Sequence, residues 1–259
     1  MGMNIQSSSI FEQMYEQNKI QSKAFSLCFA RSEEVEKDGS IAGAFTLGGT
    51  DTKLHDEPMI YANGFATKGT MHGVNLKNVY LMEAGQYGAG DATLDNTHVL
   101  PGLDLNKLNT GSVIVDSGTT DTYMNSILGT PFKNTWKELV GVSYSTSKMK
   151  LTEEQVEKIP TILIQLEGSG EQTYNKNDAI PGLAGSIDSK NPNDIIIAMP
   201  PAHYVEYDPK KDVYMGRFSV SEKYGSVLGA NFMRGRFCCV VIHCHESSFL
   251  LIESCLSFV

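Results

Sequence analysis

The sequence has no apolar run as long as the roughly 18 residues that a membrane-spanning helix needs. Its first residues also lack the basic-then-apolar pattern of a secretory signal peptide. We therefore expect neither a membrane segment nor a signal in this chain. Its 259 residues, 41% hydrophobic and 20% charged, can bury one large core or two smaller ones, which predicts a globular protein.

Positive charge is in the minority. The sequence has 21 Lys and Arg against 30 Asp and Glu, which gives a formal net charge of -9. No basic stripe with interleaved aromatics is present to neutralise phosphates. We therefore expect no nucleic-acid partner.

Motifs of other catalytic classes are missing as well. There is no G-x-S-x-G nucleophile elbow, and the glycine-containing stretch 85–90 is not followed by Lys-Ser or Lys-Thr as in a phosphate-binding loop. No H-E-x-x-H or similar metal-binding spacing includes the dispersed histidines His55, His72, His98 and His203. The sequence thus supports no competing catalytic class.

The five cysteines are unevenly placed. Cys28 stands alone, and the others crowd near the end of the chain: Cys238, Cys239, Cys244 and Cys255. This is not the spacing of a disulfide framework. We therefore expect Cys28 to be buried and unpaired, and the compartment cannot be inferred from cysteine usage.

The cysteine-rich end also carries His243 and His245, and thiolates and imidazoles are the usual ligands of zinc. However, adjacent cysteines and a Cys-x-x-x-x-Cys step lack the paired turn spacing of a structural zinc site. A strand would also place neighbouring residues on opposite faces. We expect no metal there.

Short runs rich in Val, Ile, Phe and Tyr, separated by Gly and Pro turns, dominate the pattern of the chain. They predict strands at 41–47, 79–82, 162–166, 195–198 and 214–218. Three short helices are predicted, one capped by Ser9, one opening at Pro131, and one capped by Thr152 and ended by Pro160. The polar stretch 175–194 is predicted to be a surface loop. The expected fold class is all-β with a few short surface helices.

The most informative motif is the run Val113-Ile114-Val115-Asp116-Ser117-Gly118-Thr119-Thr120. An apolar strand delivers Asp116 onto a turn, where Gly118 lets the backbone approach the carboxylate closely and the hydroxyls can hydrogen-bond to it. The alternative is that Asp116 is an ordinary turn residue after a buried strand.

This run resembles the C-terminal-lobe signature of pepsin-like (A1) aspartic proteases, including the beta-secretase branch with Ser after the Asp. Other segments resemble the family in the same order along the chain: 10–17 with 23–27, 45–51, 159–162, 199–204 and 227–229. The resemblance covers nearly the whole chain. It implies an all-β acid-protease lobe of closed-over sheets, with the aspartate on a ψ-shaped loop.

The resemblance also implies the chemistry. Two carboxylates share one proton, so that one activates a water and the other protonates the substrate carbonyl or leaving group. Asp116 would be one of them, supported by the Gly118 N–H and the Thr119 hydroxyl. Ser117 would brace this lobe against its partner lobe, and Thr120 would at most line the substrate cleft. The implied partner is a peptide or protein substrate, and no metal or organic cofactor is expected.

The sequence contains no second D-T-G or D-S-G triplet. The pair Asp38-Gly39 follows a charged stretch and predicts a hairpin turn. We therefore expect 1–30 to be the tail of an N-terminal lobe with the interlobe connection, and 31–236 to be the C-terminal lobe. Residues 237–259 diverge from the family, although 237–242 can form the expected strand.

Three interpretations remain open: a truncated gene product, a peptide-binding lobe without catalysis, and an active homodimer. The homodimer is the less favoured, because neither Tyr144 nor Tyr174 lies in a glycine-tipped flap. Family members work in secretory, vacuolar or extracellular compartments, but neither a signal nor a predicted disulfide supports that location here.

Overall fold

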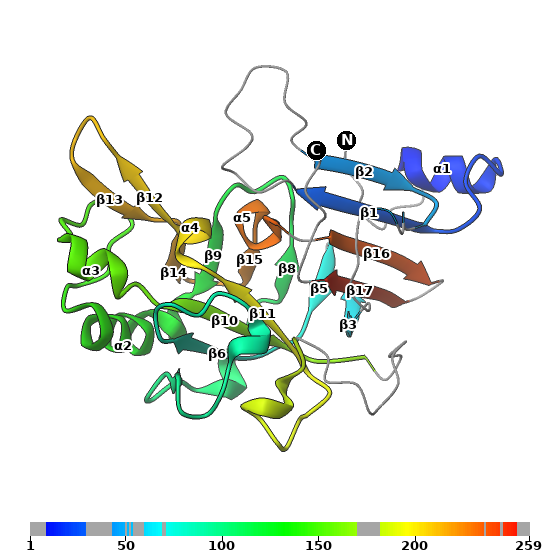
Figure 1. Cartoon of the computed structure of the whole chain (residues 1–259). Coiled ribbons are helices and arrows are strands. Elements are labelled where there is room, and N and C mark those ends of the chain that lie inside the picture. The colour runs from blue at the N-terminus through cyan, green and yellow to red at the C-terminus, as the bar shows by residue number, and fades with distance from the viewer. Residues whose placement is uncertain are drawn as a thin grey trace. The chain divides into compact units, whose positions relative to one another are not determined.

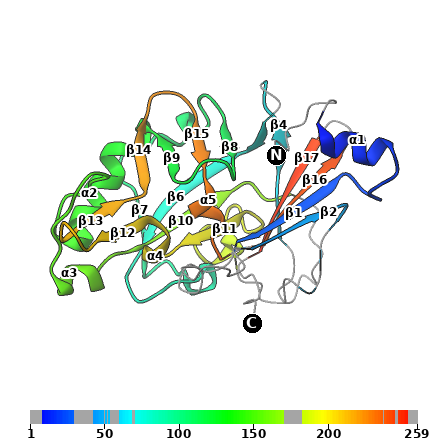
Figure 2. The same cartoon turned by 90° about the horizontal axis from the view of Figure 1, so that it is seen from above.

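The computed structural model describes residues 9–29, 43–49, 51, 53, 60–68, 71–169, 182–235, 237–243 and 246–252, the last two ranges by their backbone only. Strands dominate these residues and the helices are short, as Figure 1 and the view from above in Figure 2 show. The prediction of an all-β fold with a few short helices is therefore confirmed.

The chain divides into two compact units. Unit 1 comprises Met1–Val74, Gly168–Ile180 and Met233–Val259, and unit 2 comprises Asn75–Glu167 and Pro181–Phe232. The two units do not coincide with the predicted segments 1–30, 31–236 and 237–259. The assignment of those segments to parts of two lobes stays a prediction.

Unit 1 contains an antiparallel sheet of five strands. Their order is β2 (Gly43–Leu47), β1 (Ala24–Phe29), β16 (Phe237–His243), β17 (Glu246–Ile252) and β3 (Ile60–Ala62). Strands β4 (Gly64–Ala66) and β5 (His72–Val74) form a hairpin. The strand predicted at 41–47 is confirmed over 43–47, while residues 41 and 42 and the predicted turn at Asp38-Gly39 lie outside the described residues. The strand predicted at 237–242 is confirmed, whereas β17 was not predicted.

Helix α1 (Ile10–Glu16) begins where the sequence predicts it. The Ser9 hydroxyl caps it by accepting a hydrogen bond from the Glu12 N–H at 3.2 Å. The buried Phe11 ring packs edge-on against Phe25 of β1, with 5.6 Å between ring centroids. One apolar face therefore holds this short helix on the sheet.

Cys28 corrects an expectation. It is buried in β1, as predicted, but it forms a disulfide bond and is not unpaired. All four other cysteines follow residue 237, where the structure does not describe side chains. Sequence spacing does not show the bond, because no other cysteine lies near Cys28 along the sequence.

Unit 2 contains two sets of four paired strands. The first set is β11 (Ile195–Met199), β10 (Thr161–Leu166), β6 (Leu76–Met82) and β7 (Thr97–Val99), in that order. The second is β14 (Phe218–Glu222), β9 (Thr122–Asn125), β15 (Ser226–Leu228) and β8 (Val113–Val115). In the second set, β15 runs parallel to β8 and antiparallel to β9. The strands predicted at 79–82, 162–166 and 195–198 are confirmed.

The predicted strand 214–218 is wrong in one respect. It is split at Arg217 between β13 (Val213–Gly216), which pairs with β12 (Val205–Asp208), and β14. The cause is tertiary, because the Tyr144 hydroxyl binds both backbone groups of Phe218, donating to its carbonyl and accepting from its N–H. A Cβ on Gly216 would lie 2.2 Å from that hydroxyl, so only glycine fits.

Two helices of unit 2 follow the sequence prediction. Helix α2 (Gly129–Val140) begins two residues before Pro131, and Gly141 ends it with a left-handed φ of 83°. Helix α3 (Glu153–Glu157) has the capping box of Thr152 and Gln155. The one-turn helices α4 (Pro201–Tyr204) and α5 (Ala230–Met233) were not predicted. None of the described helices is long and apolar enough to span a membrane.

The Tyr204 hydroxyl donates a buried hydrogen bond to the Pro160 carbonyl. Segments 159–162 and 199–204, which the sequence linked only through resemblance, therefore meet in the folded chain.

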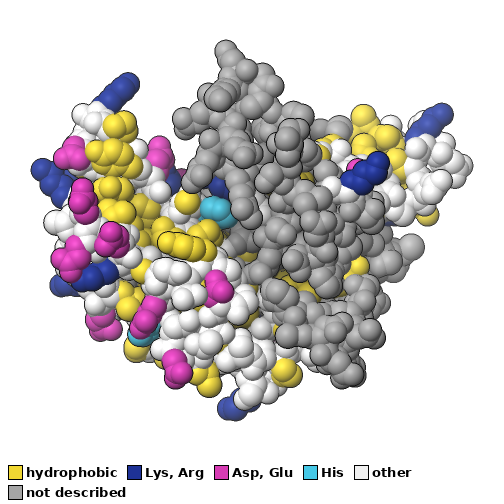
Figure 3. All heavy atoms as spheres, in the orientation of Figure 1, with side chains coloured by type: hydrophobic (Ala, Val, Ile, Leu, Met, Phe, Trp, Pro, Cys, Tyr) yellow, Lys and Arg dark blue, Asp and Glu magenta, His cyan; other side chains and the backbone are white. Residues whose placement is uncertain are grey.

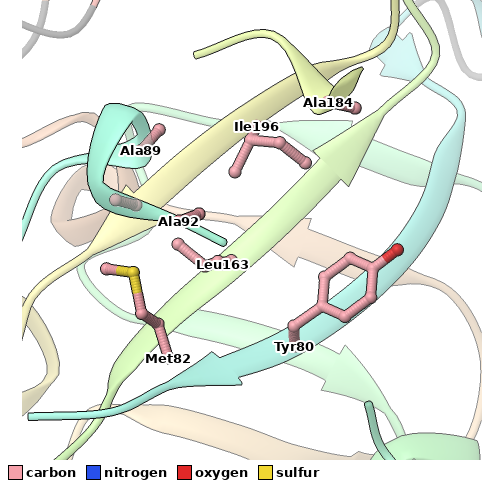
Figure 4. Close-up of a cluster of buried hydrophobic side chains, with 8 residues drawn as sticks. Tyr80, Met82, Ala89, Ala92, Leu163, Ala184 and Ile196 are labelled. Carbon is pink, nitrogen blue, oxygen red and sulfur yellow. The ribbon is translucent and has the colours of Figure 1, made fainter. Parts of the chain in front are cut away.

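Small and large side chains interlock in one core cluster of unit 2 (Figure 4). The cluster consists of Tyr80, Met82, Ala89, Ala92, Leu163, Ala184, Ile196 and Ala198. Ala184 belongs to the stretch 175–194 predicted to be a surface loop, yet it is fully buried. The chain turns inward there, because Leu183 bridges to Ile195 and the Ala184 N–H donates to the Asp194 carbonyl at 2.8 Å. Residues 175–181 of that stretch lie outside the described part.

The hairpin of β12 and β13 carries exposed aromatic surface. On the face seen in Figure 3, hydrophobic side chains gather over this hairpin and acidic ones flank them. Tyr207 is 45% exposed, and its ring centroid lies 4.8 Å from that of Tyr214 on the neighbouring strand. The pair holds the two strands together across the sheet.

Replacing Leu163 by Ala should lower the free energy of unfolding by about 2–5 kcal/mol, because this fully buried side chain fills the centre of the cluster. Urea denaturation would measure the change. The matched control is Leu94→Ala at a site that is 75% exposed, where we expect a change below about 0.5 kcal/mol. Equal losses in both variants would contradict the described packing.

Replacing Cys28 by Ala should lower the free energy of unfolding by about 2–4 kcal/mol, because the disulfide constrains the unfolded chain. Peptide mapping of the non-reduced protein should find the Cys28 peptide linked to one that contains a cysteine beyond residue 237. A free Cys28 thiol in the oxidised protein would overturn the assignment.

Candidate active site

The turn after β8 presents Asp116. Val113 and Val115 of β8 are buried, and the next residue leaves the sheet where β15 ends. The Asp116 N–H donates to the Leu228 carbonyl at 3.0 Å, which continues the parallel pairing of the two strands. The apolar strand thus fixes the point from which the half-buried carboxylate emerges.

The turn binds both oxygens of this carboxylate. The Gly118 N–H donates to Oδ1 at 2.9 Å, and the Thr119 hydroxyl donates to Oδ2 at 2.7 Å. A Cβ on Gly118 would lie 3.1 Å from Oδ1, which is a tight approach that glycine avoids. The orientation of the carboxyl group is therefore set by its own turn.

The segment after β15 supports the turn from behind. The Ala230 N–H donates to the Thr119 carbonyl at 2.7 Å, and the Asn231 N–H donates to the Thr120 carbonyl at 3.1 Å. A Cβ on Gly229 would lie 2.2 Å from the Asp121 carbonyl oxygen, so only glycine permits this contact. Segment 227–229, chosen from the sequence by resemblance alone, therefore lies against the turn.

Two predicted residues have no contact that defines a role. Ser117 is exposed, and no hydrogen bond of its hydroxyl is found within the described residues. Its bracing bond to a partner lobe stays a prediction. Thr120 is also exposed, and its place in a substrate cleft stays a prediction too.

Asp121 is the acidic residue closest to Asp116 in the sequence, but it faces another group. Its Oδ2 lies 3.8 Å from Nη1 of Arg217, which also binds Glu206. Burial raises the pKa of Asp121 above its ordinary 3.8; Arg217 lowers the pKa in part, and Glu206 raises it. No hydrogen bond joins Asp116 to a second carboxylate in the part of the chain that the structure describes. The site there contains one carboxylate of the expected pair.

Buried polar residues behind the turn were missed in the sequence. Thr122 and Asn231 are buried and hydrogen-bonded to one another. A polar residue next to an apolar run could have indicated each of them in the sequence. Thr122 begins a mostly buried strand, and Asn231 lies two residues after the run Val227-Leu228-Gly229.

The described side chains include no group of three or more His, Cys, Asp or Glu placed to hold a metal ion. The cysteines and histidines considered above for zinc lie beyond residue 237, where side chains are not described.

Comparison with known families gives a match over most of the chain. The model of the family described as "Eukaryotic aspartyl protease" matches residues 2–247 of the 259. The matched range includes the Asp116 turn and the segment behind it. No curated protein matches the chain.

Replacing Asp121 by Asn should stabilise the protein more at pH 7 than at pH 3. Because folding raises the pKa of Asp121, its contribution to stability is present below 3.8 and is lost as the pH rises through the raised pKa. Asparagine stays neutral throughout and avoids that loss. Chemical denaturation at both pH values would measure the difference.

Asp95→Asn, at an exposed position, controls for the change in net charge. A stability difference for Asp121→Asn that falls between pH 3 and pH 7 would show that the fold favours the Asp121 charge, against this account.

Proposed function

The chain belongs to the eukaryotic aspartyl protease family, and we propose that Asp116 is one of two carboxylates with which it hydrolyses peptide bonds. The observation that carries the proposal is the Asp116 carboxylate, which the Gly118 N–H and the Thr119 hydroxyl hold at the end of β8. Such preorganisation costs no rearrangement when charge moves during the reaction.

In the proposed reaction, an ionised carboxylate takes a proton from a bound water while the water oxygen attacks the peptide carbonyl carbon. The second carboxyl group gives its proton to the carbonyl oxygen. The C–N bond then breaks. The first carboxyl group passes the proton from water to the leaving amine, and the second carboxylate takes a proton back from the diol as the new carboxyl product forms. In such a dyad the two carboxylates share one proton.

Asp116 has the contacts that such a group needs. Each oxygen accepts one hydrogen bond from the turn, and a carboxylate oxygen has a further lone pair for water or for the shared proton. The sequence contains no second D-S-G or D-T-G triplet that could supply the other aspartate. We infer that it comes from another polypeptide segment or from a second copy of the chain.

The proposed substrates are peptides or proteins bound in an extended conformation. The Cys28 disulfide favours an oxidising compartment, in agreement with a secretory, vacuolar or extracellular location.

A second candidate is a peptide-binding protein without catalysis. The single Asp-Ser-Gly triplet favours it, because a lone carboxylate has no partner for proton exchange. In that case the Asp116 turn would bind peptide but not cleave it.

Incubating the purified chain with a hydrophobic peptide at acidic pH tests the proposal, with mass spectrometry of the products. We expect cleavage when the segment or copy that supplies the second carboxylate is present, and a loss of rate by at least about 10²-fold in Asp116→Asn, because the amide cannot act as the base. Asp95→Asn is the matched control and should keep full activity.

Unchanged activity in Asp116→Asn would contradict the proposal. Absence of cleavage, together with binding of a statine-containing peptide that weakens in Asp116→Asn, would support the binding protein. A specific activity that rises with protein concentration would identify a second copy as the source of the other carboxylate.

A further inference from the structure

A buried network of neutral polar groups lies directly behind the Asp116 turn. The Thr122 hydroxyl donates to Oδ1 of Asn231 at 2.7 Å, and Nδ2 of Asn231 donates to the Arg217 carbonyl at 2.8 Å. The Thr122 N–H donates to the same carbonyl at 3.3 Å. The Gly229 N–H reaches the Thr122 hydroxyl at 3.4 Å. Thr122 is 0% and Asn231 is 7% exposed, so water does not replace these bonds easily.

The same residues hold the end of the turn through their backbone. The carbonyls of Thr119 and Thr120 accept from Ala230 and Asn231, and the turn then enters β9 at Thr122. Asn231 therefore binds the turn by its backbone N–H and Thr122, the first residue of β9, by its side chain.

A buried polar group left without a partner is costly, which restricts the network to few arrangements. Asparagine suits position 231 because one planar amide offers an acceptor to Thr122 and a donor to Arg217. Aspartate would place a second acceptor against the Arg217 carbonyl. Valine at position 122 would keep the shape of threonine but remove the hydroxyl.

We propose that Thr122 and Asn231 are positioning residues of the active site. They form no hydrogen bond to the Asp116 carboxylate, whose described partners are Gly118 and Thr119. They fix the end of the turn so that the Thr119 hydroxyl and the Gly118 N–H stay on the two carboxylate oxygens. The consequence for catalysis rests on the proposed function, whereas the geometric claim does not.

Amide NMR of the full chain tests the geometric claim with the isosteric variant Thr122→Val. We expect the Gly118 amide resonance to shift and the Ala230 amide to exchange at least about tenfold faster than in the wild type. The amide of Ile164, in the buried strand β10, should exchange at an unchanged rate if the fold is intact. Thr122→Ser keeps the hydroxyl and should restore the wild-type values.

Asn231→Asp gives an independent test. It should shift the Gly118 amide resonance and speed Ala230 amide exchange as Thr122→Val does. If the Gly118 amide resonance and the Ala230 amide exchange rate in Thr122→Val equal those of the wild type, the positioning role is wrong. If the amide exchange rates of Ile164 and Ala230 rise by the same factor, Thr122 stabilises the whole fold and does not position the turn, so the proposal is also wrong.

Kinetics separates this inference from the proposed function. With peptide cleavage as the readout, Thr122→Val should lower kcat more than it changes KM, and Thr122→Ser should recover kcat. A shift of the Gly118 amide resonance in Thr122→Val, in a chain that does not cleave peptide, would support the positioning role and reject the protease function. An active enzyme in which kcat is the same for the Val and Ser variants would reject the positioning role alone.

Discussion

The hydrogen bond from the Asp116 N–H to the Leu228 carbonyl is the constraint on which the candidate site depends. It extends the parallel pairing of β15 with β8 by one residue, so the aspartate leaves the sheet at a fixed point. The turn can then bring its own N–H and hydroxyl donors to the carboxylate. The same geometry brings Gly229 against the turn, at a distance that excludes any side chain.

Neutral and charged groups have separate places around this turn. The buried bonds of Thr122 and Asn231 are between uncharged groups, and they do not change with pH in the acidic range where carboxylates titrate. The charged side chains of Asp121, Arg217 and Glu206 form a partly exposed cluster, and only the backbone carbonyl of Arg217 belongs to the neutral network. The turn at Asp116 is thus supported by groups that keep their hydrogen bonds across this pH range.

Local patterns predicted much of this fold from sequence. The Ser9 and Thr152 caps, several of the strands and the turn at Asp116 follow from short-range rules. Features that depend on distant residues were missed: the break at Arg217 follows from Tyr144, and the burial of Ala184 follows from Ile195. The Cys28 disulfide was missed because all other cysteines lie far from Cys28 in the sequence. The same holds at the site, where Thr122 and Asn231 are 109 positions apart and meet only in the fold.

The most direct test of the role of Asp116 is a crystal structure of the chain, with its second carboxylate supplied by its natural partner or copy, bound to a statine-containing peptide. We predict that the statine hydroxyl lies about 2.6–3.2 Å from a carboxylate oxygen of Asp116, where the reacting water would be. A peptide bound elsewhere, with the Asp116 turn empty, would contradict the account.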